Sequence, residues 1–119
     1  MKTHKDLEVW KLAIDFVSEI YLITKQFPEA EKFGLSTQMR RASVSIPSNI
    51  AEGAARQSDK EFIQFLYIAL GSTAELETQL IIAFNLNFIK QNQLDQLILK
   101  QEQIAKMLNG LIKFIKNKS

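Results

Sequence analysis

Apolar residues recur at steps of three and four along nearly the whole chain, and this period constrains the fold more than any other feature. In the first stretch they are Leu7, Trp10, Ala13, Ile14, Val17, Ile20 and Tyr21. Such spacing is typical of an α-helix with one buried face. Only four glycines and two prolines interrupt 119 residues, so few positions favour turns. We therefore predict an all-α chain.

Breaks in this period divide the chain into four predicted helices, at about residues 5–26, 35–56, 59–86 and 93–117. Proline disfavours helical geometry in the residue before it, so Phe27-Pro28 ends the first helix. The expected caps of the later helices are Ser36 or Thr37, Ser58 with Glu61 in a capping box, and Asn92 with Asp95. Short links force neighbouring helices antiparallel, which predicts one domain over residues 1–119, an up-down-up-down four-helix bundle.

The composition excludes several classes of chemistry. The chain has no cysteine and a single histidine, His4, near its start. Cysteine nucleophiles, disulfides and thiolate metal sites are therefore excluded, and histidine catalysis has little support. No apolar run approaches the roughly eighteen residues of a membrane helix, and the first residues do not resemble a signal peptide. We expect a cytoplasmic protein that is not an enzyme, with no metal and no cofactor.

Polar residues form one row on the second predicted helix and another on the third. Within a helical arc of about 100°, the second helix places Gln38, Arg41, Ser45, Ser48, Asn49, Glu52 and Arg56. The third carries Ser72, Glu75 and Gln79 although it is apolar nearly all round. One interpretation is a solvated face with an Arg56–Glu52 pair one turn apart. Another is a structural polar network of Ser45, Asn49, Glu52, Ser72, Glu75 and Gln79, which we favour over a catalytic or metal-binding role for the two carboxylates.

Other features of the second helix point to its packing. Pro47 removes a backbone donor, so we expect a kink there, with the Ser43 and Ser45 hydroxyls bonding carbonyls one turn back. Arg40 points away from the polar row, beside small residues that would allow another helix to approach closely.

The aromatic residues Trp10, Phe27, Phe33 and Phe62 could stack on bases, but at helical spacing we expect them in the core.

The basic residues are the candidates for contact with nucleic acid. They are Arg40, Arg41 and Arg56, the only arginines of the chain, together with Lys106, Lys113 and Lys116. The stretch from Lys106 to Lys118 has four lysines and no acid. Such a stretch is commonly a solvated face that complements the negative end of its helix. It can also bind phosphates with little sequence preference.

Three segments resemble a known family. They are LEVWKLA (residues 7–13), FPEAEKFGLSTQMRRASVSIPSNIAEG (residues 27–53) and FIQFLYIALGSTAELETQL (residues 62–80). Together they resemble the bacterial four-helix bundle proteins encoded in intervening sequences of 23S rRNA genes, and residues 45–53 are similar to the most recognisable stretch of that family. The family includes relatives of the accessory variability determinant of diversity-generating retroelements. The last predicted helix matches only by its apolar pattern.

The resemblance implies a homopentameric barrel of bundles, which would cover the wide apolar surface of the third helix. It also implies partners of two classes. The first hypothesis is a non-enzymatic homopentamer that binds nucleic acid, such as structured rRNA, through basic patches repeated around the ring. The alternative is a protein-interaction scaffold or accessory subunit for a partner such as a reverse transcriptase, with no direct role in binding RNA.

Overall fold

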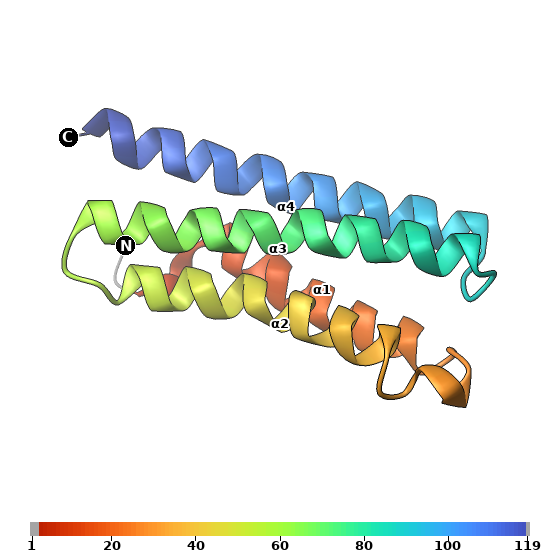
Figure 1. Cartoon of the computed structure of the whole chain (residues 1–119). Helices are drawn as coiled ribbons and strands as arrows, with labels where there is room; N and C mark the ends of the chain where they lie inside the picture. Colours follow the sequence, from red (N-terminus) through yellow and green to blue (C-terminus); the bar gives the residue numbers. More distant parts are fainter. Residues whose placement is uncertain (1–2, 119) are drawn as a thin grey trace.

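The computed structural model describes residues 3–118 as a bundle of four long helices (Figure 1). The helices are α1 (Glu8–Thr24), α2 (Leu35–Ala54), α3 (Asp59–Asn85) and α4 (Gln91–Lys118), with short 3-10 helices η1 (His4–Asp6) and η2 (Glu29–Glu31) before α1 and α2. Each long helix runs antiparallel to the one before it. The prediction of an all-α chain with four helices is confirmed, and the bundle measures 47 × 24 × 19 Å.

The start of α2 is stabilised differently from the prediction. Neither Ser36 nor Thr37 caps the helix, so that expectation is wrong. Instead, Oε1 of Glu31 accepts a hydrogen bond from the backbone N–H of Leu35 at 3.1 Å. The Thr37 hydroxyl donates to the carbonyl of Lys32 in the preceding loop. The carboxylate of η2 therefore supplies the acceptor that a capping hydroxyl supplies in other helices.

Both ends of α3 have well-defined caps. Oγ of Ser58 accepts from the backbone N–H of Glu61 at 3.2 Å, which confirms the serine half of the predicted capping box. At the other end Asn87 adopts φ 64°, a left-handed conformation that asparagine tolerates. The N–H of Phe88 donates to the carbonyl of Ala83 at 2.9 Å. This is a Schellman motif without glycine, and it turns the chain towards α4.

The helix α4 begins two residues earlier than predicted, at Gln91. The expected cap by Asn92 with Asp95 is wrong, because Asn92 already lies inside the helix. Oε1 of Gln93 accepts from the backbone N–H of Lys90 at 2.8 Å, and Nε2 of Gln91 donates to Asp95 at 2.7 Å. Glutamine side chains thus do the work that the sequence pattern attributed to asparagine.

The core runs along the whole bundle and draws on every long helix. Its largest fully buried apolar side chains are Phe16, Ile20, Met39, Ile46, Ile50, Leu66, Leu76, Leu80, Ile104 and Leu108. Of the four aromatic residues expected in the core, Phe27 is buried and Trp10 and Phe62 are half-buried. Phe33 is 89% exposed, so its assignment to the core is wrong. It lies in the loop after η2, where helical spacing no longer determines which side faces inward.

Close packing of α2 against α3 depends on Gly53. A Cβ atom at this position would lie 2.7 Å from Cβ of Phe65 and 3.2 Å from the carbonyl oxygen of Phe62. Any side chain at Gly53 must therefore displace α3.

The four helices do not pack evenly around the bundle. α2 packs extensively on both α1 and α3, and α3 on α4, whereas α1 and α4 share the thinnest contact.

Candidate nucleic-acid interface

Three residues of the predicted polar network join α2 to α3. Oγ of Ser72 donates to Oγ of Ser45 at 2.8 Å, and Nδ2 of Asn49 donates to the same oxygen at 2.9 Å. Ser72 is buried, and the other two residues are half-buried. Nearby, α2 is continuous through Pro47, and the Ser43 hydroxyl donates to a carbonyl one turn back, as expected. The Ser45 hydroxyl instead joins the interhelical cluster.

The two carboxylates of that set lie apart from this cluster. Glu52 is exposed and forms an ion pair with Arg56 at 2.9 Å on its own helix. Glu75 is exposed, and its Oε2 accepts from Nε2 of Gln79 at 3.3 Å. The buried Oε1 of Gln79 has no hydrogen-bond partner among the described residues. The structure therefore does not bring Glu52 and Glu75 together as an acid–base pair.

Arg40 is held by α1 rather than by a carboxylate. Its Nε donates to Oγ1 of Thr24 at 2.9 Å, and its guanidinium carbon lies 4.8 Å from the ring centroid of Tyr21. Thr24 is 3% exposed and donates in turn to the carbonyl of Ile20 at 2.8 Å. This chain of contacts fixes the guanidinium at the surface between α1 and α2. Cation–π contact with Tyr21 adds to the restraint.

The other two arginines, Arg41 in α2 and Arg56 just after its end, differ in whether a carboxylate lies beside them. Arg56 pairs with Glu52, lies 3.9 Å from Glu61, and stands 4.8 Å from the ring centroid of Phe65. Arg41 is exposed, and no carboxylate of residues 3–118 forms an ion pair with it. The charge of Arg56 is therefore compensated within the chain, and that of Arg41 is not.

The lysines of α4 form a second basic surface. Lys106 and Lys113 are exposed, and Lys116 lies on the same side of the helix. Nζ of Lys116 donates to the Tyr67 hydroxyl at 2.8 Å, which ties α4 to α3. The six predicted nucleic-acid contacts thus fall in three places: the first half of α2, the end of α2, and the C-terminal half of α4.

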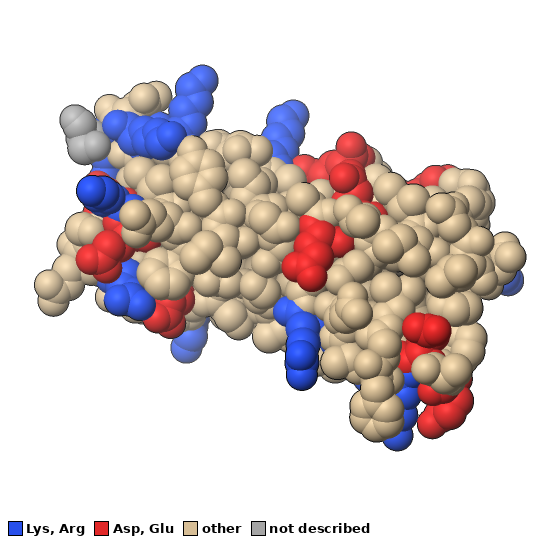
Figure 2. Space-filling model, in the orientation of Figure 1, with Lys and Arg blue, Asp and Glu red and all other residues tan. Residues whose placement is uncertain are grey.

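The outer surface of α3 separates these basic places. Between residues 61 and 85 the only charged side chains are Glu61, Glu75 and Glu77. Ile68, Ile81 and Ile82 are large apolar residues that remain 51%, 45% and 41% exposed. Figure 2 shows this face: basic and acidic groups lie together at the end that holds the chain termini, further basic groups project from the edges, and the middle is mostly uncharged apart from an acidic group.

Sequence reasoning missed the role of α1 in placing Arg40. The hydrogen bond from Arg40 to Thr24 spans sixteen positions of the chain. A helical projection of α2 alone cannot show it, because the contact depends on how α1 is rotated. The exposed aromatic ring of Tyr21, one turn before a buried threonine, is the sequence signal that could have suggested a partner for a cation.

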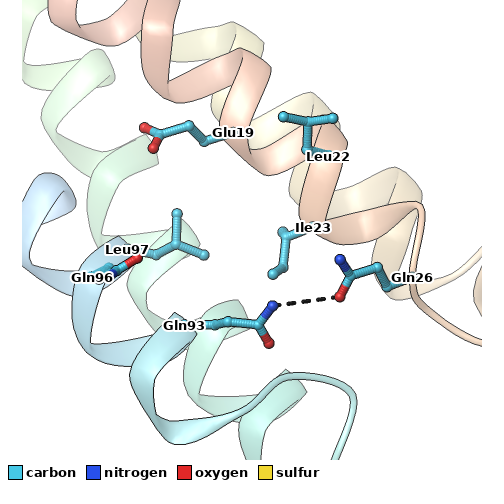
Figure 3. A pocket seen from close by; sticks show the side chains of 7 residues that line it. All are labelled: Glu19, Leu22, Ile23, Gln26, Gln93, Gln96 and Leu97. Atoms are coloured by element: carbon cyan, nitrogen blue, oxygen red, sulfur yellow. Dashed lines mark hydrogen bonds between the residues drawn. The ribbon is translucent and has the colours of Figure 1, made fainter.

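A hollow of about 220 Å³ lies at the thin contact between α1 and α4 (Figure 3). It is lined by Glu19, Leu22, Ile23, Gln26, Gln93, Gln96 and Leu97. Nε2 of Gln93 donates to Oε1 of Gln26 at 3.5 Å across it, and Lys100 forms an ion pair with Glu19 beside it. Three amides and one paired carboxylate do not make a catalytic constellation.

Within residues 3–118 no three histidine, aspartate or glutamate side chains are grouped closely enough to hold a metal ion. None of the described helices combines the length and the apolar character needed to cross a bilayer.

Comparison with known proteins identifies the family. Residues 5–110 match the family model described as 23S rRNA-intervening sequence protein. The chain is also similar to a crystal structure of a protein of unknown function from the S23 ribosomal protein family of Bacteroides thetaiotaomicron, with 30% identity and a TM-score of 0.82 over 88% of this chain and 98% of that one. Neither description names an enzymatic activity, and no curated protein matches the sequence. The chain belongs to the 23S rRNA-intervening sequence protein family.

Proposed function

We propose that this protein is a non-enzymatic, cytoplasmic RNA-binding protein that assembles as a homopentamer and contacts structured RNA, such as rRNA, through basic surfaces repeated around the ring. The observation that carries the proposal is the C-terminal half of α4, where Lys106 and Lys113 are exposed and no acid occurs from Lys106 onwards. Exposed lysines attract the phosphate backbone with little regard to sequence.

The outer surface of α3 supports assembly. On this helix Ile68 lies in the first half and Ile81 and Ile82 lie in the second, and each is about half-exposed. Large apolar side chains left exposed in this way are candidates for burial in an interface. A closed ring would cover them and would repeat every basic surface, so weak contacts would act together.

The family supports the choice of RNA as the ligand. Both the family description and the description of the Bacteroides structure refer to ribosomal components. A net charge of +2 is small for one chain, but five copies carry about +10 on one particle. Repetition therefore supplies what a single chain lacks.

Light scattering behind size exclusion tests this function. The full-length protein is run alone and with total cellular RNA, first at low and then at moderate salt. We expect a particle near 68 kDa, about five times the 13.6 kDa chain, that retains RNA at low salt and releases it as salt rises. A monomer, or a pentamer that ignores RNA at low salt, would contradict the proposal.

A second candidate is a scaffold for a protein partner, such as the reverse transcriptase that the resemblance suggests. The exposed apolar side chains of α3, Ile68, Ile81 and Ile82, favour it, because a partner protein could cover them. Such an interface depends far less on salt than phosphate binding does. Binding of a partner that persists at moderate salt, in a protein that retains no RNA at low salt, would replace the first proposal by this one.

A further inference from the structure

A polar hollow lies between the second half of α1 and the first half of α2. It measures about 550 Å³ and is lined by Tyr21, Thr37, Arg40, Arg41, Val44 and Ser45. Two of these six residues are arginines, and three carry hydroxyls. The hollow around Trp10 and Pro47, which shares Val44 with it, is lined by no arginine, lysine, aspartate or glutamate. The two arginines therefore distinguish the first hollow from the second.

The guanidinium of Arg40 is fixed before any ligand arrives. Its Nε donates to the buried hydroxyl of Thr24, and the guanidinium carbon lies over the ring of Tyr21. This arrangement occupies one of the five N–H donors and leaves the four donors of the terminal nitrogens. Holding a long side chain in place removes much of the entropy cost that an exposed arginine would pay on binding.

Two further donors border the same hollow. Arg41 follows Arg40 directly and is exposed. Oγ of Ser45 accepts hydrogen bonds from Ser72 and Asn49, so its own proton is available to a further acceptor. The donors therefore approach the hollow from consecutive turns of α2.

No acid neutralises this pair of arginines. Among residues 3–118 the ion pairs of arginine all belong to Arg56, and no aspartate or glutamate lines the hollow. Two arginines that line the same hollow, together with the available hydroxyl of Ser45, form a site for an anion with several acceptor oxygens. A phosphate group meets that requirement, because its oxygens accept from several directions at once, and arginine binds it bidentately.

We propose that the Tyr21–Arg40–Arg41–Ser45 hollow is a phosphate-binding site, and that its ligand is a phosphodiester of the bound RNA. This inference rests on the proposed function and deepens it, because it adds a specific phosphate contact at α2 and α1 to the general attraction of the α4 lysines. It also assigns no RNA contact to Arg56, whose charge is already matched.

The test compares Arg41→Gln with Arg56→Gln, two variants of equal net charge. Arg41 makes no contact that the fold requires, so its variant retains the native structure. Binding of a labelled RNA hairpin is measured by anisotropy over a range of salt. We expect Arg41→Gln to weaken binding about tenfold and to lower the slope of log K against log salt by about one, while Arg56→Gln leaves both nearly unchanged. Arg40→Lys, which keeps the charge but loses the fork, should also weaken binding.

A second measurement separates the site from the function. The Nε–H signals of arginine in a ¹⁵N-labelled sample number three in this chain, one for each residue. Titration with inorganic phosphate should shift the signals of Arg40 and Arg41 and leave that of Arg56 in place. If the native protein binds no RNA but these two signals shift, the proposed function fails and the phosphate site stands.

Two outcomes would overturn the inference. If RNA binds but Arg41→Gln and Arg56→Gln weaken it equally or not at all, the lysines of α4 carry the binding, and the proposed function survives without this site. If phosphate shifts all three arginine signals alike, or none of them, the hollow has no selectivity for phosphate.

Discussion

Arg40 lies on α2 and Arg56 just after its end, yet the partners of Arg40 are uncharged and those of Arg56 include carboxylates. Arg56 has Glu52 at 2.9 Å and Glu61 at 3.9 Å, whereas Arg40 has a threonine hydroxyl and an aromatic ring. Both guanidinium groups stand 4.8 Å from a ring centroid. The difference in charge comes from the two carboxylates beside Arg56. A basic residue is therefore a candidate for binding an anion only where the fold leaves its charge unmatched.

The largest expected effect is on the Arg56 side of this comparison. Gly53→Ala would place a Cβ 2.7 Å from Cβ of Phe65, the residue whose ring supports Arg56. Overpacking outweighs the gain in helix propensity, so we expect the free energy of unfolding to fall by about 2 kcal/mol. Urea denaturation measures this, and RNA binding by the folded protein should persist.

Gly71→Ala is the matched control for that experiment. A Cβ at Gly71, in the middle of α3, meets no atom within 4 Å. The same substitution there should raise the free energy of unfolding by about 0.5 to 1 kcal/mol. Equal effects of the two variants would show that α2 and α3 do not need the close approach at Gly53.

An intermediate effect is expected on the Arg40 side. Thr24→Val removes the hydroxyl that accepts from Arg40 and leaves the shape of the side chain unchanged. We expect a loss of about 1 kcal/mol in stability, because Nε loses its acceptor, and RNA binding that is several-fold weaker. Thermal unfolding and anisotropy measure the two quantities on the same sample.

Thr73→Val controls for the loss of a buried threonine hydroxyl. Thr73 is 1% exposed, and its hydroxyl bonds only the carbonyl of Leu70 in its own helix, at 2.6 Å. RNA affinity should not change in this variant. If Thr24→Val and Thr73→Val weaken binding equally, Arg40 does not need its restraint.

The smallest expected effect comes from removing the nearer of the two carboxylates beside Arg56, which leaves Glu61 at 3.9 Å. Glu52→Gln removes an ion pair whose side chains are 44% and 56% exposed, so stability should fall by at most about 0.5 kcal/mol. Reducing the negative charge beside Arg56 should strengthen RNA binding about two-fold. Glu102→Gln on α4 makes the same change in net charge. An equal gain in that variant would mean that only total charge matters.

The fold was predictable from sequence because each helix carries its own apolar period. The helix ends were less predictable, because the start of α2 is bonded by Glu31 from the preceding turn, and the start of α4 by Gln93, which accepts from the N–H of Lys90 in the manner of the third residue of a capping box. Those side chains reach backbone donors through the path of the loops. A pattern of residue types does not contain that path.

The candidate site was predictable only in part. The sequence placed Ser45, Asn49 and Ser72 in polar rows, and the structure joins them. It could not show that Glu52 and Glu75 face solvent, since the rotation of each helix about its axis is set by its neighbours. Nor could it show that Thr24 holds Arg40, because that contact depends on the packing of α1.

The thin contact between α1 and α4 has a consequence for dynamics. Because α1 is attached mainly through α2, its amide protons should exchange with solvent by local opening sooner than those of α2 and α3, which are packed on two sides. Thr24 and Tyr21, which position Arg40, both belong to this helix. Hydrogen exchange of α1 therefore reports how often the Arg40 guanidinium is released, and a bound anion should slow it.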